Sequence, residues 1–206
     1  MVGKYWKDLK IITCHLGSGA SICAIDHGKS VNNSMGMTSL EGLTMGSRCG
    51  DIDVGALLYL MERAGMSVKE ANDMLYKKSG LVGLSGGAQD MRDIWAGRNE
   101  GDQRCIYAFD VFAQRCKKYI GAFMAQMNGC DLLIFTGGIG ENAWFMRHAI
   151  LQDMEWLGVD VDMDLNDCTA GMDCVISRPR SRVTTMVVTT DEELAIAIDT
   201  YKIVSA

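Results

Sequence analysis

Residues 132–142 read LLIFTGGIGEN, a short apolar run followed by a glycine-rich turn. The run Leu132–Thr136 is typical of a strand that is buried on both faces of a sheet. The turn after it predicts a helix start, where converging N–H groups and the helix dipole favour a phosphate or the polar parts of a nucleotide. The stretch therefore predicts a buried strand that ends in an anion-binding turn, with a purely structural tight turn as the alternative.

A second glycine-containing turn lies near the N-terminus. Leu9–Cys14 and Ala20–Ile25 predict two strands, and His15–Gly19 joins them. Because glycines lack a Cβ atom, backbone N–H groups in such a turn can approach an anion closely, although an ordinary hairpin turn explains it equally well. With a further turn at Asp26–Lys29, this part of the chain predicts an antiparallel β-meander.

The rest of the chain alternates predicted helices with predicted strands. Helices are expected over Val54–Ala64, from Ser67 to about Gly80, over Cys105–Asn128 and from the 137–142 turn to about Gly158. The glycine-rich residues 79–93 predict an irregular surface loop instead. A strand at Val183–Thr189 and a terminal helix capped by Asp191 complete the chain. This order predicts one mixed α/β domain, in which helices flank a partly parallel sheet.

Composition narrows the classes of partner. The 206 residues are 48% apolar and carry 20 basic and 26 acidic side chains, a formal net charge of −6 that disfavours nucleic acid. The first ten residues do not resemble a secretory leader, and no run of 18 apolar residues occurs. None of the eight cysteines forms a C-x-x-C pair. We therefore expect a soluble cytoplasmic protein with no membrane contact.

One rival hypothesis comes from the second glycine turn. Gly138-x-Gly140-x-x-Ala143 satisfies the dinucleotide fingerprint, with Asp160 and Asp162 about twenty residues further on. That fingerprint normally opens a doubly wound fold, whereas here it lies late in the chain. A dinucleotide oxidoreductase therefore stays a weaker alternative. The chain has no P-loop motif and no G-x-S-x-G or H-E-x-x-H motif.

Four further residues are candidates for phosphoryl-transfer chemistry, which needs positive charge, a metal ion and positioning. Arg48 lies in the flexible segment MGSRCG and offers a planar donor fork, although a lone arginine is more often a surface residue. His15 could donate to a phosphate or be a structural hydrogen bonder. Glu192 and Glu193 could hold Mg²⁺, although acids are equally expected in the first turn of a helix.

An ordered set of motifs extends from about Lys10 to the C-terminus. They are CHLGxGAS (14–21), SMG (34–36), LEG (40–42), MGxRxGDID (45–53), KSG (78–80), DxRD (90–93), TGGIGEN (136–142) and EEL (192–194). Together they resemble the acetate kinase family. The resemblance implies a ribonuclease-H-like domain of the actin, Hsp70 and sugar kinase superfamily, and specifically the second, nucleotide-binding domain. It also implies the reversible reaction of ATP with acetate to give ADP and acetyl phosphate.

The resemblance also implies roles for individual residues. Arg48 would stabilise the transferring phosphoryl group, and Glu192 would help to bind Mg²⁺. The residues expected to contact the ATP or ADP phosphates are His15, Leu16, Gly17, Ser18 and Gly19. Those expected to hold the rest of the nucleotide are Asp90, Met91, Arg92, Gly138, Ile139, Gly140, Glu141 and Asn142. Family members form homodimers through this domain, so the same is expected here.

The chain departs from the family in several ways. It has no counterpart to the N-terminal domain, so we expect it to be inactive unless a companion chain supplies that domain. Ser18 replaces a usual asparagine, and Ser39, Val54 and Thr189 stand where prolines are usual. The Ser39 change leaves propionate or butyrate open as the acyl substrate, and the proline losses should loosen two turns slightly. A non-catalytic nucleotide-binding or assembly module of the same fold is a further alternative.

Overall fold

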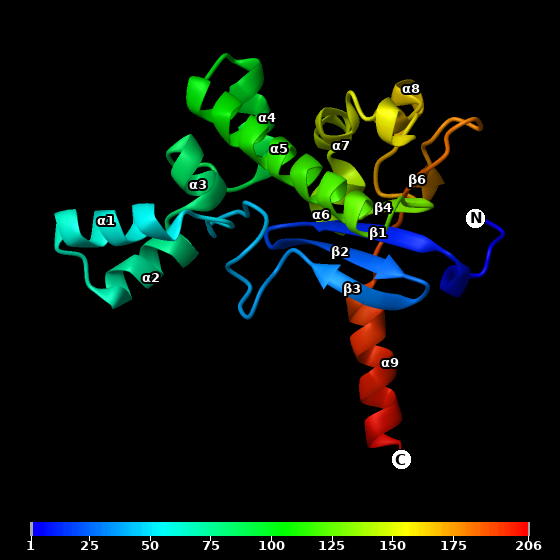
Figure 1. Cartoon of the computed structure of the whole chain (residues 1–206), viewed down its shortest axis with the longest axis horizontal. Coiled ribbons are helices and arrows are strands. Elements are labelled where there is room, and N and C mark those ends of the chain that lie inside the picture. Colours follow the sequence, from blue (N-terminus) through cyan, green and yellow to red (C-terminus); the bar gives the residue numbers. More distant parts are fainter. Residues whose placement is uncertain (1, 206) are drawn as a thin grey trace.

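A six-stranded mixed sheet forms the centre of the computed structural model, which describes residues 2–205 (Figure 1). Its strands are β1 (Lys10–Leu16), β2 (Ala20–Asp26), β3 (Lys29–Asn33), β4 (Leu132–Thr136), β5 (Cys174–Val175) and β6 (Thr184–Val187). They lie in the order β3-β2-β1-β4-β6-β5. β2 runs antiparallel to β1 and β3, whereas β4 is parallel to β1 and β6 is parallel to β4. The predicted β-meander and partly parallel sheet are confirmed, and the order is that of the ribonuclease-H-like fold.

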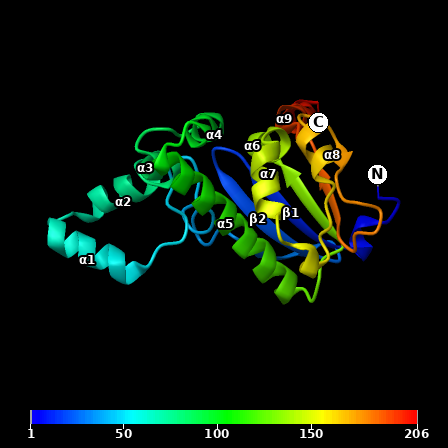
Figure 2. The ribbon, with the colours of Figure 1, turned by 90° about the horizontal axis from the view of Figure 1, so that it is seen from above.

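Helices cover one face of this sheet and extend beyond its edges. They are α1 (Val54–Ala64), α2 (Val68–Lys77), α3 (Gly80–Ser85), α4 (Met91–Asn99), α5 (Gln103–Gln126), α6 (Gly137–Asn142), α7 (Trp144–Leu151), α8 (Met163–Cys168) and α9 (Glu192–Val204). Short 3-10 turns occur at Trp6–Asp8 and Glu155–Leu157. Seen from above, α5 and α7 lie across the sheet, whereas α1 and α2 project from one end (Figure 2). Sequence patterns did not predict α8 or β5.

The main hydrophobic core lies between the sheet and α5. In β1, Ile12, Cys14 and Leu16 are fully buried and belong to the same cluster as Phe112 and Ile120 of α5. Alternation along a strand sends its remaining side chains to the opposite face. There Ile11 packs in a smaller cluster with Leu132 and Met186. The 24-residue helix α5 therefore packs against β1 and β2 and covers the centre of the sheet.

The expectation of an irregular loop over residues 79–93 was wrong, because α3 and the start of α4 occupy this stretch. The glycine-rich sequence has low intrinsic helix propensity. Contacts with a distant segment compensate for it, since the N–H groups of Leu81 and Val82 donate to the carbonyl oxygens of Met45 and Gly46 at 2.9 and 3.0 Å. Tertiary hydrogen bonds thus decided the local structure here.

The expectation of one continuous helix from residue 137 to about Gly158 was also wrong. The chain breaks at Ala143, which has φ −91° and ψ 74°, and α7 ends at Leu151. Buried Arg147 donates to the carbonyl oxygens of Gly140 and Glu141, which a continuous helix would instead satisfy from its own backbone. At this break, the Arg147 guanidinium therefore supplies hydrogen bonds that backbone N–H groups would supply in a continuous helix.

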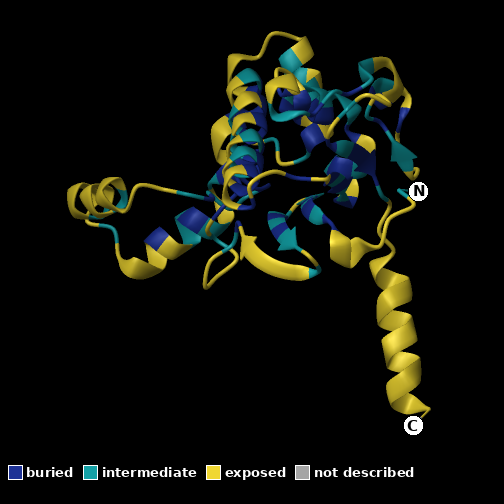
Figure 3. Cartoon of the chain, turned by 45° about the vertical axis from the view of Figure 1, so that its right-hand side comes forward, coloured by how far each residue is buried: buried dark blue, intermediate teal, exposed yellow. Residues whose placement is uncertain are grey.

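Two helices bury none of their residues. Figure 3 shows α1 and α9 as exposed segments that project away from the sheet. Exposed apolar side chains are Val54, Leu58, Tyr59 and Leu60 on α1, and Leu194, Ile196, Ile198, Tyr201, Ile203 and Val204 on α9. Within residues 2–205, no helix combines the length and apolar character needed to cross a membrane.

Two of the proline departures lie in ordered surroundings. Val54 is the first residue of α1, after its capping residue Asp53, a position where proline is favourable in other helices. Thr189 donates both its N–H and its hydroxyl to Asp173, each at 2.8 Å. Proline has neither donor. The turn at Thr189 is therefore tied by two hydrogen bonds that the usual family residue could not make.

Candidate functional site

The two glycine-rich turns meet at one edge of the sheet. β1 and β4 are parallel neighbours, with His15 opposite Thr136, so the turns that follow them lie side by side. Gly137 has φ +77°, and a Cβ atom at this position would lie 2.8 Å from the carbonyl oxygen of Leu16. Glycine is therefore required where the turns touch. Ligands of sheets with parallel strands commonly bind beyond the carboxyl ends of those strands, which is where this junction lies.

A cavity of about 410 Å³ opens beside this junction. Its volume is suited to a small-molecule ligand. The lining residues come from both turns, from the start of α4 and from the start of α7: Gly17, Ser18, Gln89, Asp90, Met91, Arg92, Gly138, Ile139, Asn142, Ala143 and Phe145. A neighbouring hollow of about 540 Å³ shares Gly17, Ser18 and Gly138, and is also lined by His15, Gly19, Ala20, Ser21 and Met35. We call the first the apolar cavity and the second the outer hollow.

Most of the residues predicted to bind the nucleotide line one of these spaces, but three do not. Leu16 and Gly140 are buried beneath the turns. Glu141 is half-buried, and its Oε1 atom accepts hydrogen bonds from the N–H groups of Gly137 and Thr190, at 2.9 and 3.0 Å. Glu141 therefore ties the turn after β4 to the segment that leads into α9. In this structure these three residues support the site rather than face it.

Asp90 and Arg92 form an ion pair at the mouth of the apolar cavity. Asp90 caps α4 by accepting from the N–H of Arg92, and it also accepts from the Arg92 side chain at 3.0 and 2.6 Å. These hydrogen bonds lower the pKa of Asp90 to about 2. The Arg92 side chain remains 86% exposed, so part of its donor fork is free to meet an anionic ligand.

Arg48 reaches the β1–β2 turn from a separate loop. Its Nη1 atom donates to the carbonyl oxygen of Ser39 at 2.7 Å. Its Nη2 atom lies so close to Gly19 that a Cβ atom there would be 2.6 Å away. The N–H of Gly17 is already used within the turn, where it donates to the carbonyl of Gly19. The nearby donors that remain include the Ser18 hydroxyl and the Arg48 guanidinium.

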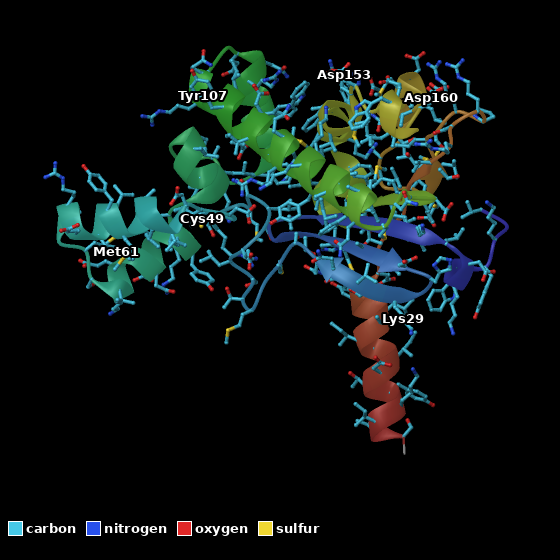
Figure 4. The ribbon with its side chains drawn as sticks, viewed as in Figure 1. Lys29, Cys49, Met61, Tyr107, Asp153 and Asp160 are labelled. Carbon is cyan, nitrogen blue, oxygen red and sulfur yellow. The ribbon has the colours of Figure 1, made fainter. Side chains whose placement is uncertain are left out.

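The loop that carries Arg48 is held by the junction between α2 and α3. The Ser47 hydroxyl donates to the carbonyl of Tyr76 at 2.9 Å, the N–H of Cys49 donates to Leu75, and the N–H of Ser79 donates to Ser47. Gly80 has φ +59°, and a Cβ atom there would lie 2.2 Å from the carbonyl oxygen of Met45. Figure 4 shows Cys49 where this loop meets the helices, nearer to the sheet than Met61 of α1. We call these contacts between the Arg48 loop and residues 75–80 the clamp. Sequence patterns did not predict the clamp, although a glycine at position 80 was consistent with a close backbone contact.

A second support for this loop comes from α5. Asp51 accepts hydrogen bonds from Tyr119, Lys118 and the N–H of Gly42. Partial burial acts to raise the pKa of Asp51, but these hydrogen bonds and nearby Arg115 outweigh it, so the pKa is lowered. Burial and the hydrogen bond to Asp51 raise the pKa of Tyr119 to about 12. Both ends of the Arg48 loop are therefore fixed to neighbouring helices.

His15, which lines the outer hollow, lies near Glu192. The His15 Nε2 atom lies 3.9 Å from Oε1 of Glu192, which is in the first turn of α9 and is largely exposed. Mg²⁺ in nucleotide sites is often held by one or two carboxylates together with phosphate oxygens, so Glu192 fits such a role. Within residues 2–205, no group of three or more histidine, cysteine, aspartate or glutamate side chains could hold a metal ion.

Arg147 is a residue of the site that sequence reasoning missed. It is fully buried and donates five hydrogen bonds, to Gly140, Glu141, Thr169 and twice to Asn166. Burial lowers its pKa to about 10, so it remains charged at neutral pH. The available signal was a basic residue in helical register with the apolar residues Ile150 and Leu151. Phe145, which follows the glycine turn and lines the apolar cavity, was also missed.

The fold defines a class: a ribonuclease-H-like α/β domain of the actin, Hsp70 and sugar kinase superfamily. Sequence comparison gives the particular family. The model of the acetokinase family matches residues 1–198, and the chain belongs to that family. The rival hypothesis of a dinucleotide oxidoreductase was therefore wrong. Its two acidic residues serve other purposes, since Asp160, labelled in Figure 4, pairs with Arg180, and Asp162 caps α8.

Individual relatives agree with this assignment. The chain is 49% identical to an acetate kinase of Parabacteroides distasonis over 98% of its own length and 51% of the relative's. Its structure is similar to that of Porphyromonas gingivalis acetate kinase, with a TM-score of 0.94 and 44% identity over 98% of this chain and 51% of that one. It is also similar to a propionate kinase from Francisella tularensis, with a TM-score of 0.84 and 40% identity over 92% and 48%. The chain thus spans about half the length of these relatives.

Proposed function

We propose that this chain is the ATP-binding half of an acetate kinase, which transfers the γ-phosphoryl group of ATP to acetate. The observation that carries the proposal is the meeting of the two glycine-rich turns beside one cavity, within a family whose named relatives are acetate kinases. Binding the nucleotide at this junction accounts for the apolar cavity on one side and the cluster of donors on the other.

The geometry suggests how the parts would share the work. The base and ribose would occupy the apolar cavity, and the phosphates would extend past Gly138 into the outer hollow, where Ser18 offers a hydroxyl. In the reaction, an acetate oxygen forms a bond to the γ-phosphorus while the bond to the β–γ bridging oxygen breaks, and ADP leaves. Arg48, beside Gly19, would stabilise the charge that is spread over the phosphoryl oxygens.

Mg²⁺ is a further proposal. Glu192 would hold it together with phosphate oxygens, and His15 beside that carboxylate would help to fix its orientation. When bound, the metal would neutralise part of the phosphate charge. Arg48, Arg92 and Ser18 would perform their roles in positioning the nucleotide from the same side of the sheet.

The remaining half of the enzyme would have to come from outside residues 1–206. We propose that a companion domain, corresponding to the other half of the relatives, supplies the rest of the active site and covers the exposed apolar side chains of α9. The chain alone should give no acetyl hydroxamate from acetate, ATP and hydroxylamine, whereas a mixture with the N-terminal half of an acetate kinase should do so. Activity of the chain alone would contradict this division of labour.

The acyl substrate and the assembly are also proposals. Acetate is favoured by the names of the most similar relatives, and propionate is the alternative because a propionate kinase has the same fold. We propose a homodimer in which the exposed apolar side chains of α1, Leu58 among them, pack against a second copy. Cytoplasmic localisation remains a prediction from the sequence.

Calorimetric titration with Mg-ATP tests the proposal. The chain should bind Mg-ATP. Gly138 lines both spaces, and a Cβ atom at this position would meet no protein atom within 4 Å. The side chain of Gly138→Val should therefore fill space that the nucleotide needs and abolish binding. Gly121→Val on α5 is the matched control, since Gly121 is also helical with open room but lies away from both spaces. Equal affinities for the two variants would refute the assigned site. Mg-ATP binding without activity in any mixture would instead favour the non-catalytic module.

A further inference from the structure

Four aromatic side chains form a cluster behind the apolar cavity. Trp95 of α4 stacks on Phe145 of α7, with ring centroids 4.4 Å apart and an interplanar angle of 5°. The Trp144 ring is nearly perpendicular to both rings, with its centroid 6.0 Å from that of Trp95 and 5.7 Å from that of Phe145. Phe109 of α5 lies 5.5 Å from Trp95. The Trp95 ring is therefore held by neighbours on two other helices.

This stack joins the two walls of the apolar cavity. One wall consists of Asp90, Met91 and Arg92 at the start of α4, and Trp95 lies one helical turn beyond Met91 on the same helix. The opposite wall includes Asn142 and Phe145, at the end of α6 and in α7. Phe145 lines the cavity, whereas Trp95 does not. The Trp95–Phe145 pair is thus a direct side-chain bridge between these walls.

We propose that Trp95 is a positioning residue for the nucleobase: it fixes the ring of Phe145 as the wall on which the base of ATP packs. This inference rests on the proposed function. The base has a flat apolar face, and its binding gains from a wall whose orientation is set before the ligand arrives. The phosphates would be bound elsewhere, at Ser18, Gly19 and Arg48, so Trp95 acts on the base and not on the phosphates.

Comparing two ligands separates positioning from a general loss of structure. ATP uses both the apolar cavity and the outer hollow, whereas inorganic tripolyphosphate uses only the phosphate-binding part. We expect Trp95→Leu to weaken ATP binding by roughly three- to tenfold, the range of an aromatic pair, and to change tripolyphosphate binding by less than about twofold. Trp95→Phe keeps a ring at this position and should restore most of the ATP affinity.

Trp156→Leu provides the matched control, because Trp156 is 79% exposed and lines a different hollow, with Lys10 and Arg182. Both affinities should be measured by calorimetry at one magnesium concentration, and folding checked by circular dichroism. Trp95→Met repeats the test if the leucine variant does not fold. Unchanged ATP affinity in the variant, or an equal loss for both ligands, would overturn the inference. A native chain that binds neither ligand would overturn the proposed function, and this inference with it.

Discussion

Arg147 shows how one buried charge can shape a backbone turn. At the end of the glycine-rich helix α6, its side chain donates hydrogen bonds to the carbonyl oxygens of Gly140 and Glu141. The same side chain also donates to Asn166 and Thr169 at the end of α8, so it links the two segments. No carboxylate pairs directly with this arginine among the described residues. Its charge is satisfied by five hydrogen bonds to oxygen atoms. The carbonyls of Glu141 and Asn166 also accept from the N–H groups of Gly171 and Thr169, whereas the carbonyls of Gly140 and Thr169 depend on the arginine.

Replacing Arg147 should therefore be costly. Arg147→Met fills a similar volume but leaves the buried carbonyl oxygens of Gly140 and Thr169 without this donor, and we expect the free energy of unfolding to fall by about 3 kcal/mol. Urea denaturation followed by circular dichroism measures this change. Arg180→Met is the control, because the Arg180 side chain is 77% exposed and pairs at the surface with Asp160. A similar, small loss in both variants would show that Arg147 is not a structural support of the turn.

The Asp90–Arg92 pair gives a prediction about pH. Because the folded-state pKa of Asp90 is about 2, below the value of about 3.9 in an unfolded chain, the carboxylate stabilises the fold above pH 3.9. That contribution is lost as the pH falls through about 2. Arg92→Ala should raise the pKa of Asp90 toward its ordinary value, as measured by NMR titration of the carboxyl carbon. Arg98→Ala, on the same helix, should leave the Asp90 pKa unchanged, and a shift there instead would contradict the assignment.

At the scale of the element, the sequence predicted the helix caps but not the hydrogen bonds that hold the Arg48 loop against α3. Ser67 and Glu70 form the predicted capping box of α2, and Asp191 caps α9 as predicted. These bonds join residues within one turn, so local sequence contains both partners. The bonds from Leu81 and Val82 to the Arg48 loop join residues about 36 apart in the chain. No local pattern contains both of those partners.

The clamp can be tested with two glycines of the same backbone conformation. Gly80 and Gly65 have φ +59° and +61°, but a Cβ atom at Gly80 would meet the Met45 carbonyl at 2.2 Å, whereas Gly65 has open room. Gly65→Ala should cost about 1 kcal/mol of stability, from the left-handed backbone alone. Gly80→Ala should cost clearly more, at least about 3 kcal/mol, because α3 and the Arg48 loop must separate. Thermal unfolding of the two variants side by side measures this, and equal costs would disprove the clamp.

For the molecule as a whole, the exposed helices α1 and α9 mark surfaces that this chain alone does not bury. Both carry several large apolar side chains and have no buried residue. In other proteins, exposed apolar side chains that gather on one element often mark contacts with partners. The two helices leave the body in different directions (Figure 1), so they are suited to two different contacts. This agrees with the proposed homodimer at α1 and the proposed companion domain at α9.

A truncation separates these two surfaces. Removing residues 191–206 deletes α9, and the body should remain folded with little change in melting temperature, because α9 buries none of its residues. Nonspecific self-association should decrease, while the proposed dimer should persist in analytical ultracentrifugation. Leu58→Glu on α1 should have the opposite effect and give a monomer. Unfolding of the truncated chain would show that α9 contributes to the core.

By itself the sequence determined the meander and the buried strand β4, because strand alternation and glycine turns are written in neighbouring residues. Its ordered motifs indicated the family, and the resemblance to that family implied most of the residues that line the two spaces. Only the tertiary structure decided that Leu16, Gly140 and Glu141 lie behind the site, that Arg147 and Gly80 hold its loops, and that Trp95 stacks on Phe145. Those outcomes depend on contacts between residues that are far apart in the chain. Such contacts become specified only when the sheet and α5 bring the loops together.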